Sequence, residues 1–181
     1  MFTTTPDQKY LLSVLDATKT MRRDQAARLL AKLRGEHDEA YAARCLWQLR
    51  HIRKIAWKTG GVFSTPMLSN EPTDGDMLSA IDVMLDLTDR RVLSASQGPA
   101  PYKLRFLSER GNGLGQFAVV VFNAGAERSV AAALPTAPDG HAVIFLLPDL
   151  SHKARVKTSL PHYFAIRDGS RLRYFGNFGK G

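Results

Sequence analysis

Residues 38–54 read DEAYAARCLWQLRHIRK, and this stretch decides how the first third of the chain folds. At about 100° per residue on a helix, one stripe collects the apolar side chains Ala42, Cys45, Leu46, Leu49 and Ile52. The opposite side collects Arg44, Trp47, His51 and Lys54, flanked by Gln48 and Arg50. The spacing predicts a helix with one buried face and one basic face.

The residues on either side of this helix complete a small unit. Residues 55–64, IAWKTGGVFS, hold two short β-prone runs around Gly60-Gly61, which predicts a hairpin. Upstream, Thr5, Pro6 and Gln8 have the spacing of a capping box, so a first helix should run to about residue 16 or 17. A second helix should run from about residue 23 or 24 to residue 33, with Gly35 as its cap. The connection at 18–22 should be anchored by a buried Met21.

Three helices with short links and a terminal hairpin resemble the winged helix-turn-helix domains of bacterial regulators and mobile-element proteins. The resemblance covers residues 1–66 and rests on the order and spacing of the elements. It implies double-stranded DNA as the partner, with the third helix in the major groove and the hairpin on the backbone or minor groove. Arg44, Gln48 and His51 would then face bases or phosphates, and Lys54 and Lys58 would hold phosphates. Arg22 and Arg23 would grip the flanking backbone at the start of the second helix.

A protein-interaction or dimerisation role for the same unit is the alternative, because winged helices also serve as adaptor surfaces. Trp47 bears on this choice, since an indole on an outward stripe can stack on nucleic acid. More often such a residue packs under the hairpin or against a neighbouring domain. We therefore do not include Trp47 among the expected DNA contacts.

The charge distribution favours a polyanion partner for the first third of the chain. The net charge is +8, and residues 1–66 hold 12 Lys and Arg against 6 Asp and Glu. The remaining residues hold 13 against 11, so they are nearly neutral. A basic module joined to a neutral one is typical of a nucleic-acid-binding protein, although a solvated basic face would have the same composition.

The composition also bears on location. No apolar run approaches the roughly 20 residues that a membrane helix needs, and the N-terminus lacks the pattern of a signal peptide. The single cysteine, Cys45, cannot form an internal disulfide and falls on the apolar stripe of its helix. We expect a buried thiol, a cytoplasmic protein and no contact with membranes.

A turn-rich linker at 67–73 should separate the first unit from an α/β domain at 74–181. That domain should begin with a helix from about residue 74, whose acidic outer face would carry Asp82, Asp86 and Asp89 in solvent. Strands are expected at 92–95, 102–107, 117–122 and 142–147, with the last two covered on both faces. Helices are expected at 126–134 and 151–158, and a hairpin at 162–175. The fold class is thus α+β or α/β, with a small mixed sheet.

This order resembles the restriction-endonuclease-like core, and the two parts together are similar to replication-relaxation-type proteins of bacterial plasmids and integrative elements. Nucleases of that family carry Pro-Asp on one strand and Glu-x-Lys or Asp-x-Lys on the next. This chain has Pro101-Tyr102 and then Val119-Val120-Val121, and valines cannot hold the Mg²⁺ ions of phosphodiester hydrolysis. The resemblance therefore implies a core without the catalytic motif.

No other catalytic, metal or cofactor motif is present in the sequence. It lacks a phosphate-binding GxxxxGK[ST] loop, a GxSxG elbow and a zinc-ligand spacing among its five histidines. We expect a non-enzymatic DNA-binding protein, an accessory or regulatory protein of a mobile element, whose second domain positions partners, dimerises the chain or extends the DNA contact. The alternatives are a protein-protein adaptor and, last, a nuclease with an atypical site that uses Glu109 or Glu127.

Overall fold

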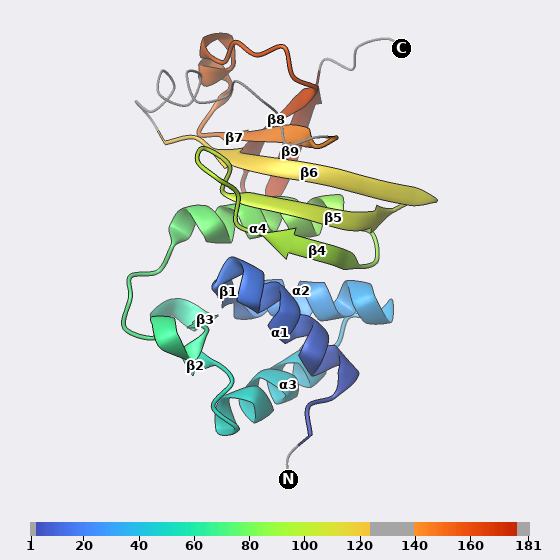
Figure 1. The fold of residues 1–181 in the computed structure, drawn as a ribbon, viewed down its shortest axis with the longest axis vertical. Helices are drawn as coiled ribbons and strands as arrows, with labels where there is room; N and C mark the ends of the chain where they lie inside the picture. The colour runs from blue at the N-terminus through green and yellow to red at the C-terminus, as the bar shows by residue number, and fades with distance from the viewer. Residues whose placement is uncertain (1–2, 124–139, 177–181) are drawn as a thin grey trace.

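The protein has a mixed α+β fold built on two sheets, which we describe for residues 3–123 and 140–176 of a computed structural model. The first part contains α1 (Pro6–Thr18), β1 (Thr20–Arg22), α2 (Arg23–Arg34), α3 (Glu39–His51), β2 (Ala56–Trp57), the 3₁₀ turn η1 (Thr59–Gly61), β3 (Val62–Ser64) and η2 (Pro66–Leu68). The second contains α4 (Gly75–Leu87), β4 (Val92–Ser96), β5 (Leu104–Arg110), β6 (Gly113–Val121), β7 (Ala142–Leu147), η3 (Leu150–Arg155), β8 (His162–Asp168) and β9 (Arg171–Gly176). Figure 1 shows the two parts one above the other.

The helix starts in the first part follow from their capping residues. Thr5 accepts from the backbone N–H of Gln8, and the Gln8 side chain accepts in turn from the N–H of Thr5, so the predicted capping box is confirmed. Asp38 caps α3 through the backbone N–H of Tyr41. The predicted boundary of α2 at Gly35 is also confirmed, because Gly35 adopts φ +75°, a conformation that glycine reaches without steric cost.

The small sheet has the order β1-β3-β2 and is antiparallel throughout. The predicted hairpin is confirmed as β2 and β3, with Gly60 and Gly61 at positive φ in the turn. Strand β1 lies where we expected only a connection. Its central residue Met21 is opposite Phe63 of β3, and both side chains are fully buried.

The large sheet has the order β4-β5-β6-β7-β8-β9, in which β6, β7 and β8 run parallel and the other neighbours are antiparallel. The prediction that β6 and β7 are covered on both faces is confirmed. Phe117 and Val119 of β6 belong to the core on the α4 side, whereas Ala118 and Val120 belong to a second core on the opposite face. The expected helix at 126–134 lies outside the described residues.

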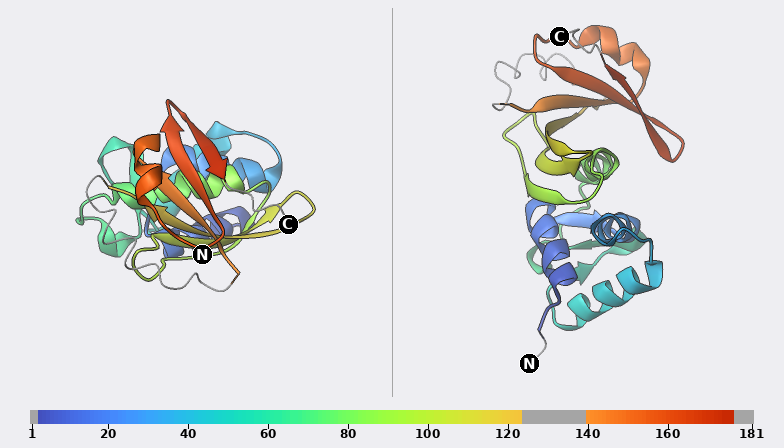
Figure 2. Two further views of the ribbon diagram at one scale, coloured as in Figure 1. Left: turned by 90° about the horizontal axis from the view of Figure 1, so that it is seen from above. Right: turned by 90° about the vertical axis from the view of Figure 1, so that its right-hand side faces the viewer.

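Helix α4 joins the two parts of the molecule. It packs against α2 and β1 on one side and against β5 and β6 on the other, so its buried residues line one continuous core. The right-hand view of Figure 2 shows α4 between the N-terminal helices and the large sheet. In both this view and Figure 1, α3 lies at the end of the molecule away from that sheet.

Some element boundaries differ from the prediction. Helix α3 ends at His51, three residues early, because Arg53 adopts φ +57° and the chain turns there toward the hairpin. The predicted helix at 151–158 is instead the 3₁₀ segment η3 at 150–155.

Candidate nucleic-acid interface

The buried stripe of α3 orients the helix in the molecule. Ala42, Cys45, Leu46 and Leu49 are at most 3% exposed. Leu46 and Leu49 pack into the main core, and Ala42 and Cys45 pack against Ala27 and Leu30 of α2. The other side of α3 therefore faces away from the body of the protein.

That outward face presents Arg44, Trp47, Gln48 and His51, all exposed. Trp47 is 61% exposed, and its ring stacks on the imidazole of His51 with centroids 5.4 Å apart and planes 8° from parallel. The expectation that Trp47 packs under the hairpin or against a neighbouring domain is thus wrong. The i, i+4 spacing of the two rings on one helix face could have indicated the stack from the sequence.

The Gln48 side chain is held in place by α1. Its Oε1 atom accepts a 2.7 Å hydrogen bond from Nε2 of Gln8, the same residue that completes the cap of α1. The orientation of the Gln48 amide therefore depends on the start of α1. In this geometry the Nε2 group of Gln48 remains as the donor for an outside acceptor.

Positive charge is also concentrated at the base of the hairpin. The guanidinium groups of Arg23 and Arg50 lie 5.0 Å and 5.7 Å from the ring centroid of Trp57 in β2. Arg23 begins α2 and Arg50 lies near the end of α3, so the indole brings together cations from two helices. Sequence reasoning included Arg23 but missed Arg50.

The two predicted lysines differ in their surroundings. Lys54 is exposed directly after α3. Lys58 is half-buried, and its Nζ atom donates a 2.6 Å hydrogen bond to the backbone carbonyl of Glu71. Lys58 therefore ties the hairpin to residues 67–73 and is a weaker candidate for a phosphate contact than Lys54.

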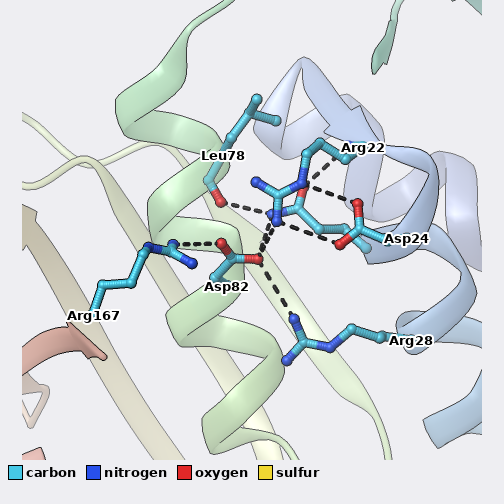
Figure 3. A network of polar contacts seen from close by, with 7 residues as sticks. Arg22, Asp24, Arg28, Leu78, Asp82 and Arg167 are labelled. Atoms are coloured by element: carbon cyan, nitrogen blue, oxygen red, sulfur yellow. Dashed lines mark hydrogen bonds and ion pairs between the residues drawn. The ribbon is translucent and has the colours of Figure 1, made fainter. Parts of the chain in front are cut away.

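Arg22 does not lie on the outward face with the other predicted residues. Its Nη2 atom is 2.7 Å from Oδ1 of Asp82 in α4, and its Nε atom is 3.0 Å from Asp24. Figure 3 shows Arg22 and Arg28 on one side of Asp82 and Arg167 of β8 on the other. The guanidinium of Arg22 is thus already paired within the protein, which makes Arg22 a weaker candidate for a contact with the DNA backbone than the residues of the outward face.

Asp82 itself corrects another prediction. It was expected in solvent with Asp86 and Asp89, but it is 3% exposed and accepts hydrogen bonds from Gln25 and Arg167 as well as Arg22. Burial by itself raises the pKa of Asp82, but these hydrogen bonds outweigh burial and hold the pKa below the ordinary 3.8. The carboxylate therefore stays ionised and joins α2, α4 and β8.

Tyr41 and Cys45 of α3 fix the helix against α1 and α2. The Tyr41 hydroxyl donates to Asp7 of α1 at 2.7 Å, and this hydrogen bond, with burial, raises the pKa of Tyr41 to about 12. Burial raises the pKa of the Cys45 thiol, which stays protonated at neutral pH. Both side chains have a structural role, and the prediction of a buried Cys45 is confirmed.

Positive charge predominates in α3 after its first turn, which carries Glu39, and in the hairpin. Residues 40–70 contain five Lys and Arg and no Asp or Glu. Four of these cations, Arg44, Arg50, Arg53 and Lys54, are exposed. A concentration of positive charge attracts phosphate over a distance of about 10 Å at 0.1 M salt.

Within residues 3–123 and 140–176, no three His, Cys, Asp or Glu side chains gather in an arrangement that could hold a metal ion. Glu109 lies at the end of β5, where its backbone pairs with Arg91, and Glu127 lies outside the described residues. The described helices include none that is long and apolar enough to cross a membrane.

Comparisons with protein-family models, curated proteins and solved structures gave no match to this chain. The protein is thus described by its α+β fold, with a small antiparallel sheet and a mixed six-stranded sheet.

Proposed function

We propose that the first 66 residues form a winged helix-turn-helix domain that binds double-stranded DNA, with α3 as the recognition helix and β2–β3 as the wing. The order α1-β1-α2-α3-β2-β3 and the sheet order β1-β3-β2 support this proposal. The observation that carries it is the outward face of α3. This face is exposed, lies at the far end from the large sheet, and belongs to a stretch with five cations and no carboxylate.

In this proposal the contacts divide into two groups. Arg44, Gln48 and His51 on α3 reach base edges or nearby phosphates, because they face outward along the helix. Arg23, Arg50 and Lys54 hold the phosphate backbone at the base of the wing. Arg22 is left out because Asp82 holds it.

We further propose that the second part is a restriction-endonuclease-like core without catalytic activity. The helix α4 followed by the antiparallel β4-β5-β6 strands, with β7 parallel to β6, supports this proposal. Val119 and Val120 of β6 are fully buried, so this segment provides no metal ligand. The proposed setting is the replication, transfer or regulation of a mobile element.

Fluorescence anisotropy with a labelled random-sequence duplex at two or more salt concentrations tests the DNA proposal. We expect binding whose logarithm falls linearly with the logarithm of the salt concentration, because cations on the protein release counterions from DNA. Arg44→Ala/Lys54→Ala should weaken binding and reduce the magnitude of that slope by about two.

The matched control is Arg171→Ala/Arg173→Ala, which removes the same charge from the exposed strand β9. It should leave the slope nearly unchanged. An equal loss in both double variants would mean that DNA does not bind at α3, and no binding at low salt would refute the proposal. The adaptor function, which the exposed Trp47 favours, would then take its place.

A further inference from the structure

The stacked rings of Trp47 and His51 form what we call the aromatic platform of α3. Recognition of duplex DNA alone does not require such a pair of rings. The ring of His51 stacks on the indole with centroids 5.4 Å apart, and Trp47 is still 61% exposed, so much of the indole surface is accessible to a ligand. Aromatic side chains bind other flat rings in offset-stacked arrangements. The platform therefore points to a ligand with a flat ring of its own.

A hollow of about 250 Å³ adjoins this platform. It is lined by Thr5 and Gln8 at the start of α1 and by Trp47, Gln48 and His51 of α3. Its volume is below the roughly 300–1,000 Å³ of sites for drug-sized ligands, so it suits one small ring. The hydrogen bond from Gln8 to Gln48 orients a polar amide at its wall, beside the open indole.

The positive charge around the platform favours a ligand whose ring is attached to phosphate. Arg44, Arg50 and Lys54 lie on or just after the same helix, whose single carboxylate, Glu39, lies in its first turn. A nucleobase on its sugar-phosphate backbone matches both features. Bases inside a continuous duplex have their flat faces covered by neighbouring pairs, whereas an unpaired base has a face free to stack on a side chain.

We propose that Trp47 and His51 bind an unpaired nucleobase next to duplex DNA, so that the protein prefers a bulge, fork or single-strand junction to a continuous duplex. The base stacks on the open face of Trp47, and Nε2 of Gln48 donates to an acceptor on its edge. The cations of α3 hold the flanking phosphates. The proposal rests on the DNA-binding function proposed above and names its substrate class.

The test compares two labelled duplexes of the same sequence, one continuous and one with a central run of unpaired thymines. Anisotropy gives the Kd of each for the full-length protein and for Trp47→Ala, Trp47→Phe and the control Leu114→Ala. Leu114 of β6 is 65% exposed, so the control removes an equally open apolar side chain elsewhere. Base stacking on an aromatic side chain contributes about fivefold or more in affinity per base.

We expect the wild type and Leu114→Ala to bind the bulged duplex about fivefold or more tightly than the continuous one. Trp47→Ala should bind the two duplexes with equal affinity, and Trp47→Phe should keep part of the preference. Equal affinity of the wild type for both duplexes would overturn the proposal, as would an unchanged preference in Trp47→Ala. Failure to bind the continuous duplex would refute the DNA-binding function itself, so the two failures are distinct.

Intrinsic fluorescence provides a second readout. The chain has two tryptophans, Trp47 and Trp57, so the signal lost in Trp47→Phe is that of Trp47. Titration with oligothymidylate should quench the wild-type emission and leave the Trp47→Phe emission unchanged, because only a stacked base reaches the indole. Equal fractional quenching in the two proteins would contradict stacking on Trp47.

Discussion

At the scale of single residues, Asp82 holds together parts of the chain that are far apart in sequence. Arg22 is 60 residues away and Arg167 is 85 residues away, yet both lie within 2.7 Å of its carboxylate oxygens. Helical periodicity placed Asp82 with Asp86 and Asp89 on one acidic face. The structure buries only the first of the three, because α2 covers that part of α4.

Replacement Asp82→Asn should lower the free energy of unfolding by about 2–3 kcal/mol. This value is at the low end for a buried ion pair because the partner arginines keep 30–43% of their side-chain surface exposed. Urea denaturation at pH 7 measures the change. The control Asp16→Asn, at an exposed position of α1, should change the stability by less than about 0.5 kcal/mol.

The wild type and Asp82→Asn should also differ in how their unfolding free energy depends on pH. The pKa of Asp82 is lower in the folded protein than its ordinary 3.8, so the ionised carboxylate stabilises the fold above about pH 4. This stabilisation is lost as the pH falls through the folded-state pKa. The difference in unfolding free energy between wild type and Asp82→Asn should therefore be largest at neutral pH and shrink below about pH 4. A difference that grows with acidity would contradict this assignment.

At the scale of elements, the cap of α1 connects the stability of a helix to the candidate interface. Gln8 completes the capping box with Thr5 and also holds the Gln48 amide of α3. The start of α1 and the outward face of α3 are therefore linked through one side chain. Capping boxes are local in sequence, which is why this one could be predicted, whereas the bond to Gln48 could not.

Replacement Thr5→Ala should cost about 1 kcal/mol of stability, because the backbone N–H of Gln8 loses its acceptor. Thr5→Ser keeps the hydroxyl and should cost only a small part of this. Urea denaturation of the three proteins gives the comparison. Equal losses in both variants would mean that the methyl group, rather than the hydroxyl, stabilises this end of α1.

At the scale of the whole molecule, α4 makes the two parts one packing unit. The linker at 67–73 separates the sheets along the chain, but one core runs from Leu11 and Met21 through Ile81 to Phe117 and Ile144. The boundary proposed at this linker remains a prediction about domains. In the described residues, one apolar core contains side chains from both sides of this linker.

We therefore predict that the protein unfolds in a single transition. Both tryptophans lie in the first part, in α3 and β2, so their fluorescence reports on that part alone. Far-ultraviolet circular dichroism reports on both parts. The two signals should have the same urea midpoint, as all-or-none unfolding requires. Separate midpoints would show that the parts unfold independently in spite of their shared core.

The sequence by itself determined the elements whose signals are local. The capping box of α1, the cap of α2 at Gly35, the hairpin around Gly60-Gly61 and the fully apolar strands β6 and β7 follow from a few neighbouring residues. It also predicted the outward face of α3, because periodicity distinguishes the two sides of a helix.

Only the tertiary structure decided which residues each face of a helix or strand contacts. Strand β1 forms because Met21 lies opposite Phe63, and three residues have too little pattern of their own to predict a strand. Arg22 pairs with Asp82, and Asp82 is buried, because side chains from β1, α2 and β8 reach α4. Trp47 stays open because α3 lies away from the large sheet. Periodicity relates side chains to the axis of their own helix, and packing between elements distant in sequence decides which of those side chains are covered.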